Sequence, residues 1–262
     1  MPTDWDPVQY NKFVEARSRP FYDLVALITP SNLGRAVDLG CGTGSLTRDA
    51  VRSLDIASAV GVDSSLAMLA DAAPMAIPSR LRFELGDIST WTSGSDHDLV
   101  LANASLQWVP DHPGVLERWT LALAPGGQLA VQVPFNHDHA AHVVADELRL
   151  SEPFNAFDVA PDPVAENVLA PEAYSQLLYD LGYEHQHVHL RVYDHLMPST
   201  LSVVEWVKGT TLTRFRTALP ADLYDEFEAR YSDRLVKVLG NRAPYFYPFK
   251  RILLWGRLPS VG

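Results

Sequence analysis

The stretch that most constrains the fold is residues 36–47, AVDLGCGTGSLT, in which an apolar run ends in an acid and three alternate glycines follow. A helical pattern begins at Ser45. Glycine is favoured where the backbone needs a positive φ angle, and where a ligand must lie directly against the chain. The pattern therefore predicts a buried strand that delivers Asp38 to a tight turn at the start of a helix. Open α/β sheets bind their ligands at this edge.

Two classes of cofactor fit such a turn. The glycines follow G-x-G-x-G, and the position that would complete a dinucleotide fingerprint holds Ser45. The next strand-like run, residues 59–62, ends in Asp63, which lies 63 − 44 = 19 residues beyond Gly44. An acid at this distance suits the hydroxyls of a ribose. A dinucleotide remains an alternative on these two features.

A third acid favours the other class. Residues 81–85 form another strand-like run that leads into Asp87, so three successive strands are each expected to end in aspartate. A nicotinamide dinucleotide would use the second acid but neither the first nor the third. Over residues 35–133 the pattern resembles the class I S-adenosylmethionine-dependent methyltransferases, a Rossmann-like α/β fold. In that class the glycine loop holds the methionine moiety, the second acid the ribose and the third acid the adenine amine.

The resemblance implies S-adenosyl-L-methionine as the cofactor and S-adenosyl-L-homocysteine as its product. The implied cofactor-binding residues are Asp38, Gly40, Cys41, Gly42, Gly44, Asp63, Ser64, Met68, Asp87, Ile88, Asn103 and Ala104.

Length and composition exclude several kinds of protein. The 262 residues, 47% hydrophobic and 20% charged, suit one large α/β domain with insertions. A net charge of −11 without a basic run opposes binding to nucleic acid. We expect no membrane segment or secretion signal, and hence a cytoplasmic protein. Because Cys41 is the single cysteine, we predict no internal disulfide and no metal site, and we interpret Cys41 as a small residue rather than a nucleophile.

Strands and helices are expected to alternate through the core, which predicts right-handed βαβ units and a parallel sheet. The expected strands are 35–39, 59–63, 81–85, 97–102, 127–133, 183–196 and 252–255. The expected helices are 45–54, 65–73, 113–123, 141–150, 171–181 and a helical region over 200–239, with an amphipathic entry over 4–27 broken at Pro20.

The domain prediction is a single methyltransferase unit over residues 1–262 with helices on both faces of its sheet. Its expected parts are a helical lid (1–30), a cofactor-binding core (31–134), a helical cap over the ligand edge (135–182 and 198–248) and final strands (183–197 and 249–258).

Several passages resemble one family, the trans-aconitate methyltransferases. They are WDPxxYxxF with RSRP in residues 5–20, DSSxxM in 63–68, ANASLQWVPDH in 102–112, AVQVP in 130–134, MP in 197–198 and EWV in 205–207. The resemblance covers nearly the whole chain. It implies a seven-stranded sheet with one antiparallel strand, and methyl transfer to one carboxylate of a small polycarboxylic acid, giving a monomethyl ester.

The residue chemistry is consistent with such a reaction. A carboxylate is already ionised at pH 7, so it needs no general base, and no catalytic dyad stands out. Catalysis would rest on alignment and exclusion of water, for which we expect Gln107 and Trp108 to position the reacting groups. A polyanion also needs a local cationic pocket, and the planar fork of arginine suits carboxylates.

The expected substrate-binding residues are Arg19, Trp206, Arg214, Arg242 and Tyr245, chosen from a larger set of cations and aromatics that included Arg17, Arg216, Tyr247, Lys250 and Arg251. Arg17 and Arg19 have an alternative role as dipole-compensating residues at a helix end.

Histidines give no competing site by spacing. His185, His187 and His189 alternate along one strand about 7 Å apart, which indicates a solvated sheet face rather than a metal site. The set formed by His137, His139 and His142 lacks a framework of acids or thiols and is interpreted as loop residues.

Two other functions remain open. One keeps the cofactor but methylates a small-molecule hydroxyl or carbon, with His112 or His137 as the base. The other is a cofactor-binding regulatory module without catalysis. We expect a monomer or weak homodimer.

Overall fold

A computed structural model describes residues 14–30 and 33–260. The strands are β1 (Arg35–Leu39), β2 (Ser58–Asp63), β3 (Leu81–Leu85), β4 (His97–Asn103), β5 (Leu123–Pro134), β6 (His185–Met197) and β7 (Tyr245–Arg257). The α-helices are α2 (Val14–Val25), α3 (Ser45–Ser53), α4 (Leu66–Ala72), α5 (His112–Leu121), α6 (Ala140–Arg149), α7 (Pro163–Asn167), α8 (Pro171–Asp180), α9 (Leu201–Lys208), α10 (Thr213–Ala218) and α11 (Ala221–Leu239). Apart from the entry segment and β7, the expected elements are found within a few residues of their predicted bounds.

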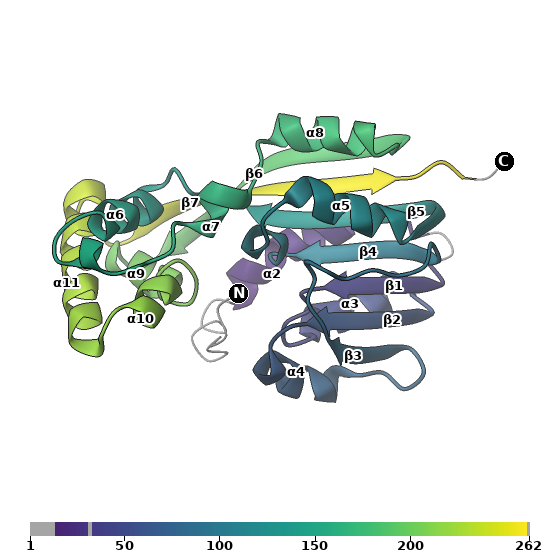
Figure 1. The fold of residues 1–262 in the computed structure, drawn as a ribbon, viewed down its shortest axis with the longest axis horizontal. Helices are drawn as coiled ribbons and strands as arrows, with labels where there is room; N and C mark the ends of the chain where they lie inside the picture. The colour runs from purple at the N-terminus through teal and green to yellow at the C-terminus, as the bar shows by residue number, and fades with distance from the viewer. Residues whose placement is uncertain (1–13, 31–32, 261–262) are drawn as a thin grey trace.

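The seven strands form one sheet in the order β3-β2-β1-β4-β5-β7-β6 (Figure 1). Pairing is parallel from β3 through β5, whereas β7 is antiparallel to both of its neighbours. The prediction of a seven-stranded sheet with one antiparallel strand is confirmed. All parallel strands therefore end at the same edge, and the three predicted aspartates meet there.

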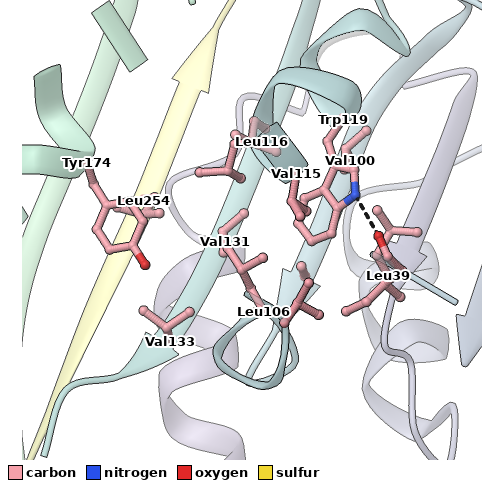
Figure 2. Packing of buried hydrophobic residues seen from close by; sticks show 14 of the residues in the cluster. Leu39, Val100, Leu106, Val115, Leu116, Trp119, Val131, Val133, Tyr174 and Leu254 are labelled. Carbon is pink, nitrogen blue, oxygen red and sulfur yellow. Dashed lines mark hydrogen bonds between the residues drawn. The ribbon is translucent and has the colours of Figure 1, made fainter. Parts of the chain in front are cut away.

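Helices cover both faces of the sheet. On one face, α5 and α8 pack over the strands with a core that includes Leu116, Trp119 and Tyr174 (Figure 2). Leu178 belongs to the same core. On the other face, α2 and α3 pack through Phe21, Leu24 and Val51 among others. The prediction placed all of residues 135–182 in the cap, including the helix that became α8. Instead, α8 lies on the sheet, because Tyr174 and Leu178 are one helical turn apart and both are fully buried.

The predicted break at Pro20 is wrong, because α2 continues through this residue. A proline inside a helix costs about 3 kcal/mol. Here the adjoining turn buries Phe21 and Leu24 in the core, and each such side chain contributes about 1.5–3 kcal/mol. Core burial therefore offsets the lost helical hydrogen bond. The predicted entry segment before residue 14 lies outside the described residues.

The cap is a second core built from α6, α9, α10 and α11, which Figure 1 shows beyond the carboxyl ends of the parallel strands. β6 and β7 join the two cores, since their pairing runs from His185 with Arg257 to Met197 with Tyr245. β7 begins at Tyr245, earlier than predicted, because Tyr245, Tyr247 and Phe249 alternate into the cap core. Pro248 is tolerated because β5 pairs only from Arg251 onward, so β7 has one strand neighbour at the proline.

No helix formed by residues 14–30 and 33–260 is long and apolar enough to cross a membrane.

Trp119 is the largest side chain buried in the core beneath α5, and its Nε1 donates to the Ile88 carbonyl at 3.2 Å. We expect Trp119→Phe to lower the free energy of unfolding by about 1–3 kcal/mol, because the carbonyl loses its donor in a buried setting. Urea denaturation measures this. Tyr179→Phe, at a site 70% exposed, is the control and should stay within about 0.5 kcal/mol. An equal, small change in both variants would contradict the prediction.

Candidate active site

The glycine loop adopts the predicted tight turn. Gly40, Gly42 and Gly44 have φ angles of 85°, 55° and 74°, a region that disfavours side chains. A Cβ at Gly40 would lie 2.2 Å from that of Ser105, so packing also excludes a side chain there. A Cβ at Gly42 would meet no atom within 4 Å among the described residues. The Gly42 backbone thus borders open space, where a ligand can lie against it.

Asp38, at the end of β1, is buried beside this loop. Its Oδ2 accepts from Thr47 Oγ1 at 2.5 Å, whereas its Oδ1 is buried with no hydrogen-bond partner in the described part of the chain. Burial raises the pKa of Asp38 to about 7, with the Thr47 hydrogen bond opposing the shift and the charge of Asp63 adding to it. A buried oxygen in this state is stabilised by a cationic donor.

Asn103, at the end of β4, extends the same arrangement. Its Oδ1 is also buried and unpartnered within residues 14–30 and 33–260. The next residue, Ala104, has a φ of 54°, and its carbonyl accepts from Gln107 Nε2 at 2.7 Å. The side-chain oxygen of Gln107, Oε1, is buried with no partner in the described chain. Three buried oxygen acceptors with no partner in the described chain thus lie near the ends of β1 and β4, and an acceptor of this kind is suited to a donor such as an ammonium group.

Asp63 is fixed by the backbone at the end of β2. Its Oδ2 accepts from Gly42 N and its Oδ1 from Ser65 N, each at 2.9 Å. Each oxygen retains acceptor capacity, which suits a pair of ribose hydroxyls. Ser65 also caps α4 by accepting from Met68 N, so the Ser64–Met68 segment is held against the loop.

Asp87 and Ile88 follow β3. Asp87 is exposed, and its Oδ1 accepts from Ser89 N at 2.8 Å. The side chain of Ile88 is buried in the sheet core, so only its backbone could face a cofactor. Cys41 is buried as well, and burial with the nearby Asp38 charge raises the pKa of its thiol. A protonated, buried thiol is consistent with the interpretation of Cys41 as a small residue rather than a nucleophile.

A cavity of about 420 Å³ lies next to this edge, between the sheet and the cap. Its sheet side includes Ala104, Gln107 and Trp108. Gln107 and Trp108 are the residues predicted to position the reacting groups. Its cap side includes Trp206 from α9 and Arg214 from α10, both predicted. The volume suits a small molecule.

Two arginines line the cavity. Arg214 stacks over Phe215 and donates through Nη1 to Asp146 Oδ1 at 3.0 Å and to the Ala160 carbonyl at 2.7 Å. Its Nη2 is buried with no partner among the described residues. Arg251, on β7, is 6% exposed, donates to Gln132 Oε1 at 3.2 Å and stacks over Phe249. Planar groups held in this way are prepared for carboxylates.

Three members of the predicted substrate set do not line this cavity in the structure. Arg19 is exposed, and its Nη1 forms an ion pair with Asp194 Oδ1 on β6 at 2.7 Å. Arg242 is exposed in the turn before β7, and its backbone is held by Thr200. Tyr245 is buried in the cap core, where its hydroxyl lies 3.3 Å from His139 Nε2.

Arg251 lines the cavity, whereas Arg242, which the prediction preferred, does not. Arg251 was in the wider candidate set, but spacing alone does not separate a buried arginine from an exposed one nine residues earlier. The strand alternation of Tyr245, Tyr247 and Phe249 would have indicated that Arg251 belongs to a long, largely buried strand.

The histidine predictions need two corrections. His112 cannot serve as a base, because both ring nitrogens are engaged by Tyr174 Oη and the Leu106 carbonyl, and burial lowers its pKa. His142 is not a loop residue, since it lies in α6, lines the cavity and contacts Asp162. His137 does not line the cavity, whereas His185, His187 and His189 are exposed on β6 as expected. No group of three or more His, Cys, Asp or Glu in the described ranges could hold a metal ion.

The sheet order, the glycine loop and the acidic strand ends together define a class I S-adenosylmethionine-dependent methyltransferase. A family model described as "Methyltransferase domain" matches residues 36–127. Trans-aconitate 2-methyltransferases from Deinococcus radiodurans and Variovorax paradoxus are 41% and 40% identical, covering 98% and 99% of this chain and 99% and 98% of their own. The chain belongs to the trans-aconitate 2-methyltransferase family.

Solved structures share the fold. The YcgJ protein from Bacillus subtilis superposes with a TM-score of 0.62 at 14% identity, over 92% of this chain and 98% of its own. Phosphoethanolamine N-methyltransferase 2 from Haemonchus contortus, in complex with S-adenosyl-L-methionine, gives 0.56 at 19% identity, over 92% and 52%. At these identities the likeness concerns architecture.

If Asp38 binds the amino group of the cofactor, as the resemblance implies, cofactor binding should have a specific pH dependence. Since its pKa is raised to about 7, it is protonated at lower pH and ionises as the pH rises. We expect the affinity for S-adenosylhomocysteine to increase by up to about tenfold per pH unit between pH 5.5 and 7, and then to level off. Calorimetric titration measures this. Asp38→Asn should bind more weakly and lose the slope; the wild-type slope in Asp38→Asn would contradict the assignment.

Proposed function

We propose that the protein transfers a methyl group from S-adenosylmethionine to one carboxylate of a small polycarboxylic acid, with trans-aconitate as the leading candidate, and releases a monomethyl ester. The names of the curated relatives support this substrate class. The observation that carries the proposal is a pair of arginines, the half-buried Arg214 and the buried Arg251, in a cavity that adjoins the cofactor edge. In a chain of net charge −11, such a pair is suited to a bound anion.

The cofactor side of the proposed site is the row of acceptors on the sheet edge. Asp38 and Asn103 would hold the amino group of the cofactor, and Asp63 would hold its ribose. The glycine loop would lie against its methionine moiety. S-adenosylmethionine, when bound, supplies an electrophilic methyl group on a sulfonium. Burial of Asp38 means that its pairing with a cation is made in a low dielectric, which strengthens it.

The substrate side needs no base. The acid's carboxylate is ionised at neutral pH, so its oxygen forms the new bond to the methyl carbon while the carbon–sulfur bond breaks and its electron pair stays on sulfur. No proton moves in this step. Arg214 and Arg251 would bind the carboxylates that do not react, because holding the attacking oxygen tightly would stabilise the ground state.

Gln107 and Trp108 line the cavity just after the end of β4, and would lie between the bound cofactor and the bound acid. Gln107 is 4% exposed and anchored to the Ala104 carbonyl, so its amide is fixed beside the cofactor edge. Trp108 and Trp206 wall the cavity with apolar surface, which limits water near the reacting atoms. Their contribution would be alignment rather than acid–base chemistry.

Mass spectrometry of products from a panel of di- and tricarboxylic acids is the direct test. A gain of one methyl on trans-aconitate would support the proposal. Methylation of another acid would keep the chemistry and shift the choice of substrate to the cap. Absence of product from every acid, with cofactor still bound, would overturn it.

The arginines give a second prediction. We expect Arg251→Gln and Arg214→Gln to raise KM for the acid by about tenfold to a hundredfold, because a charged hydrogen bond contributes about 1.5–3 kcal/mol. Affinity for S-adenosylhomocysteine should not change, which steady-state kinetics and calorimetry can separate. Arg242→Gln is the matched control, since it removes the same charge outside the cavity. An equal effect of Arg242→Gln would contradict the assignment.

A further inference from the structure

A histidine and an aspartate in the cap wall have no role in the site described so far. His142 is 5% exposed on α6 and Asp162 is 2% exposed before α7, and both line the cavity. His142 Nδ1 lies 2.5 Å from Asp162 Oδ2. Asp162 Oδ1 accepts from Val164 N at 3.0 Å, so the carboxylate also caps α7 and is fixed in place.

This contact determines which hydrogens the imidazole carries. Burial opposes ionisation of Asp162, but the hydrogen bond from His142 and the charges of His142 and Arg214 give a net lowering of its pKa. Asp162 is therefore a carboxylate at neutral pH, and Nδ1 of His142 must donate to it. The other ring nitrogen, Nε2, makes no hydrogen bond within the described chain, although the residue borders the cavity.

A nitrogen in this position can act in two ways. In the neutral ring, Nε2 is an acceptor and could take a proton from a hydroxyl substrate. In the cation, both nitrogens donate, and Nε2–H can bind a carboxylate. Arg214 and Arg251 line the same cavity, so the expected ligand is an anion. A carboxylate accepts hydrogen bonds and does not donate them, so it can pair with His142 only when Nε2 carries a hydrogen.

We propose that His142, oriented by Asp162, is a third carboxylate-binding residue of the substrate cavity and that it binds the acid as an imidazolium. The inference rests on the proposed function and deepens it. Binding of the acid would then be coupled to uptake of a proton by His142 whenever the free ring is neutral. Affinity for the acid falls as pH rises, which is opposite to the behaviour of a general base.

Other charged groups around His142 also affect the binding of an anion and its pH dependence. Asp146 and His139 lie on or beside α6, Asp158 and Asp162 in the segment before α7, Arg214 on α10 and Arg251 on β7. His139 has a pKa lowered to about 4, chiefly by burial, so it is neutral in the range of interest. A single carboxyl has a pKa near 4, so most carboxyls of the acid are ionised above pH 6.5, and a titration of the acid alone in the same buffers gives its own protonation.

The test is calorimetric titration of trans-aconitate into protein saturated with S-adenosylhomocysteine, in two buffers of different ionisation enthalpy, from pH 6.5 to 8.5. We expect net proton uptake on binding of the acid, and an affinity that weakens as the pH rises. His142→Asn should abolish the uptake and weaken binding by about tenfold or more at pH 6.5. Its affinity for S-adenosylhomocysteine should match wild type.

Two further variants separate binding from structure. Asp162→Asn keeps an acceptor that can cap α7 but removes the carboxylate, so it should also lose proton uptake. His139→Asn is the matched control, because asparagine can replace the ring that caps α6 and the variant should retain the wild-type uptake. Thermal unfolding establishes that each variant is folded.

The outcomes distinguish this inference from the function on which it rests. Binding and methylation of the acid with unchanged proton uptake in His142→Asn would overturn the role of His142 and leave the proposed function intact. An activity that rises with pH through His142 would assign it as a base instead. Absence of acid binding and of methylated product in the wild type would overturn the proposed function itself.

Discussion

The pairing of β6 with β7 is the constraint on which the rest of the site depends. Both strands are thirteen residues long and in continuous register, so they extend past the sheet and enter the cap. One end of β7 belongs to the sheet core through Leu254, and the other to the cap core through Tyr247. The cavity lies between these cores, and Arg251 occupies the point on β7 where pairing with β5 begins. A rigid strand thus fixes a cation beside the cofactor edge.

The cofactor edge was predictable from the sequence because it depends on local rules. Each of Asp38, Asp63 and Asp87 lies at or just after the end of a short strand-like run, and parallel strands bring such ends together. The positive φ angles at Gly40, Gly42 and Gly44 leave few other residues possible. In this part of the chain, local pattern and tertiary structure coincide.

The cap was predictable only in outline, because its site residues meet through tertiary contacts. Arg214 and Arg251 are 37 residues apart in sequence. The aromatic alternation before Arg251 indicates a buried strand, but it does not show that this strand faces the helix that carries Arg214. His142 and Asp162 are separated by a connection without a regular period. The Asp162-Pro163 pair is a local signal that marks the start of a helix. The contact of Asp162 with His142 can be recognised only once α6 is placed beside it.

The distribution of charge explains how one acidic protein could hold two oppositely charged ligands side by side. Buried oxygen acceptors of Asp38, Asn103 and Gln107 lie on the sheet edge, whereas the cations of Arg214 and Arg251 lie on the cap and β7. A cationic cofactor is favoured on the first side and a polyanion on the second, and each is disfavoured on the other by like charges. Gln107 lies at the boundary, anchored to Ala104 and facing the cavity. Because each ligand is stable in one place only, the reacting carboxylate and the methyl group would be oriented toward each other before any bond changes, which is the contribution that a reaction without proton transfer requires.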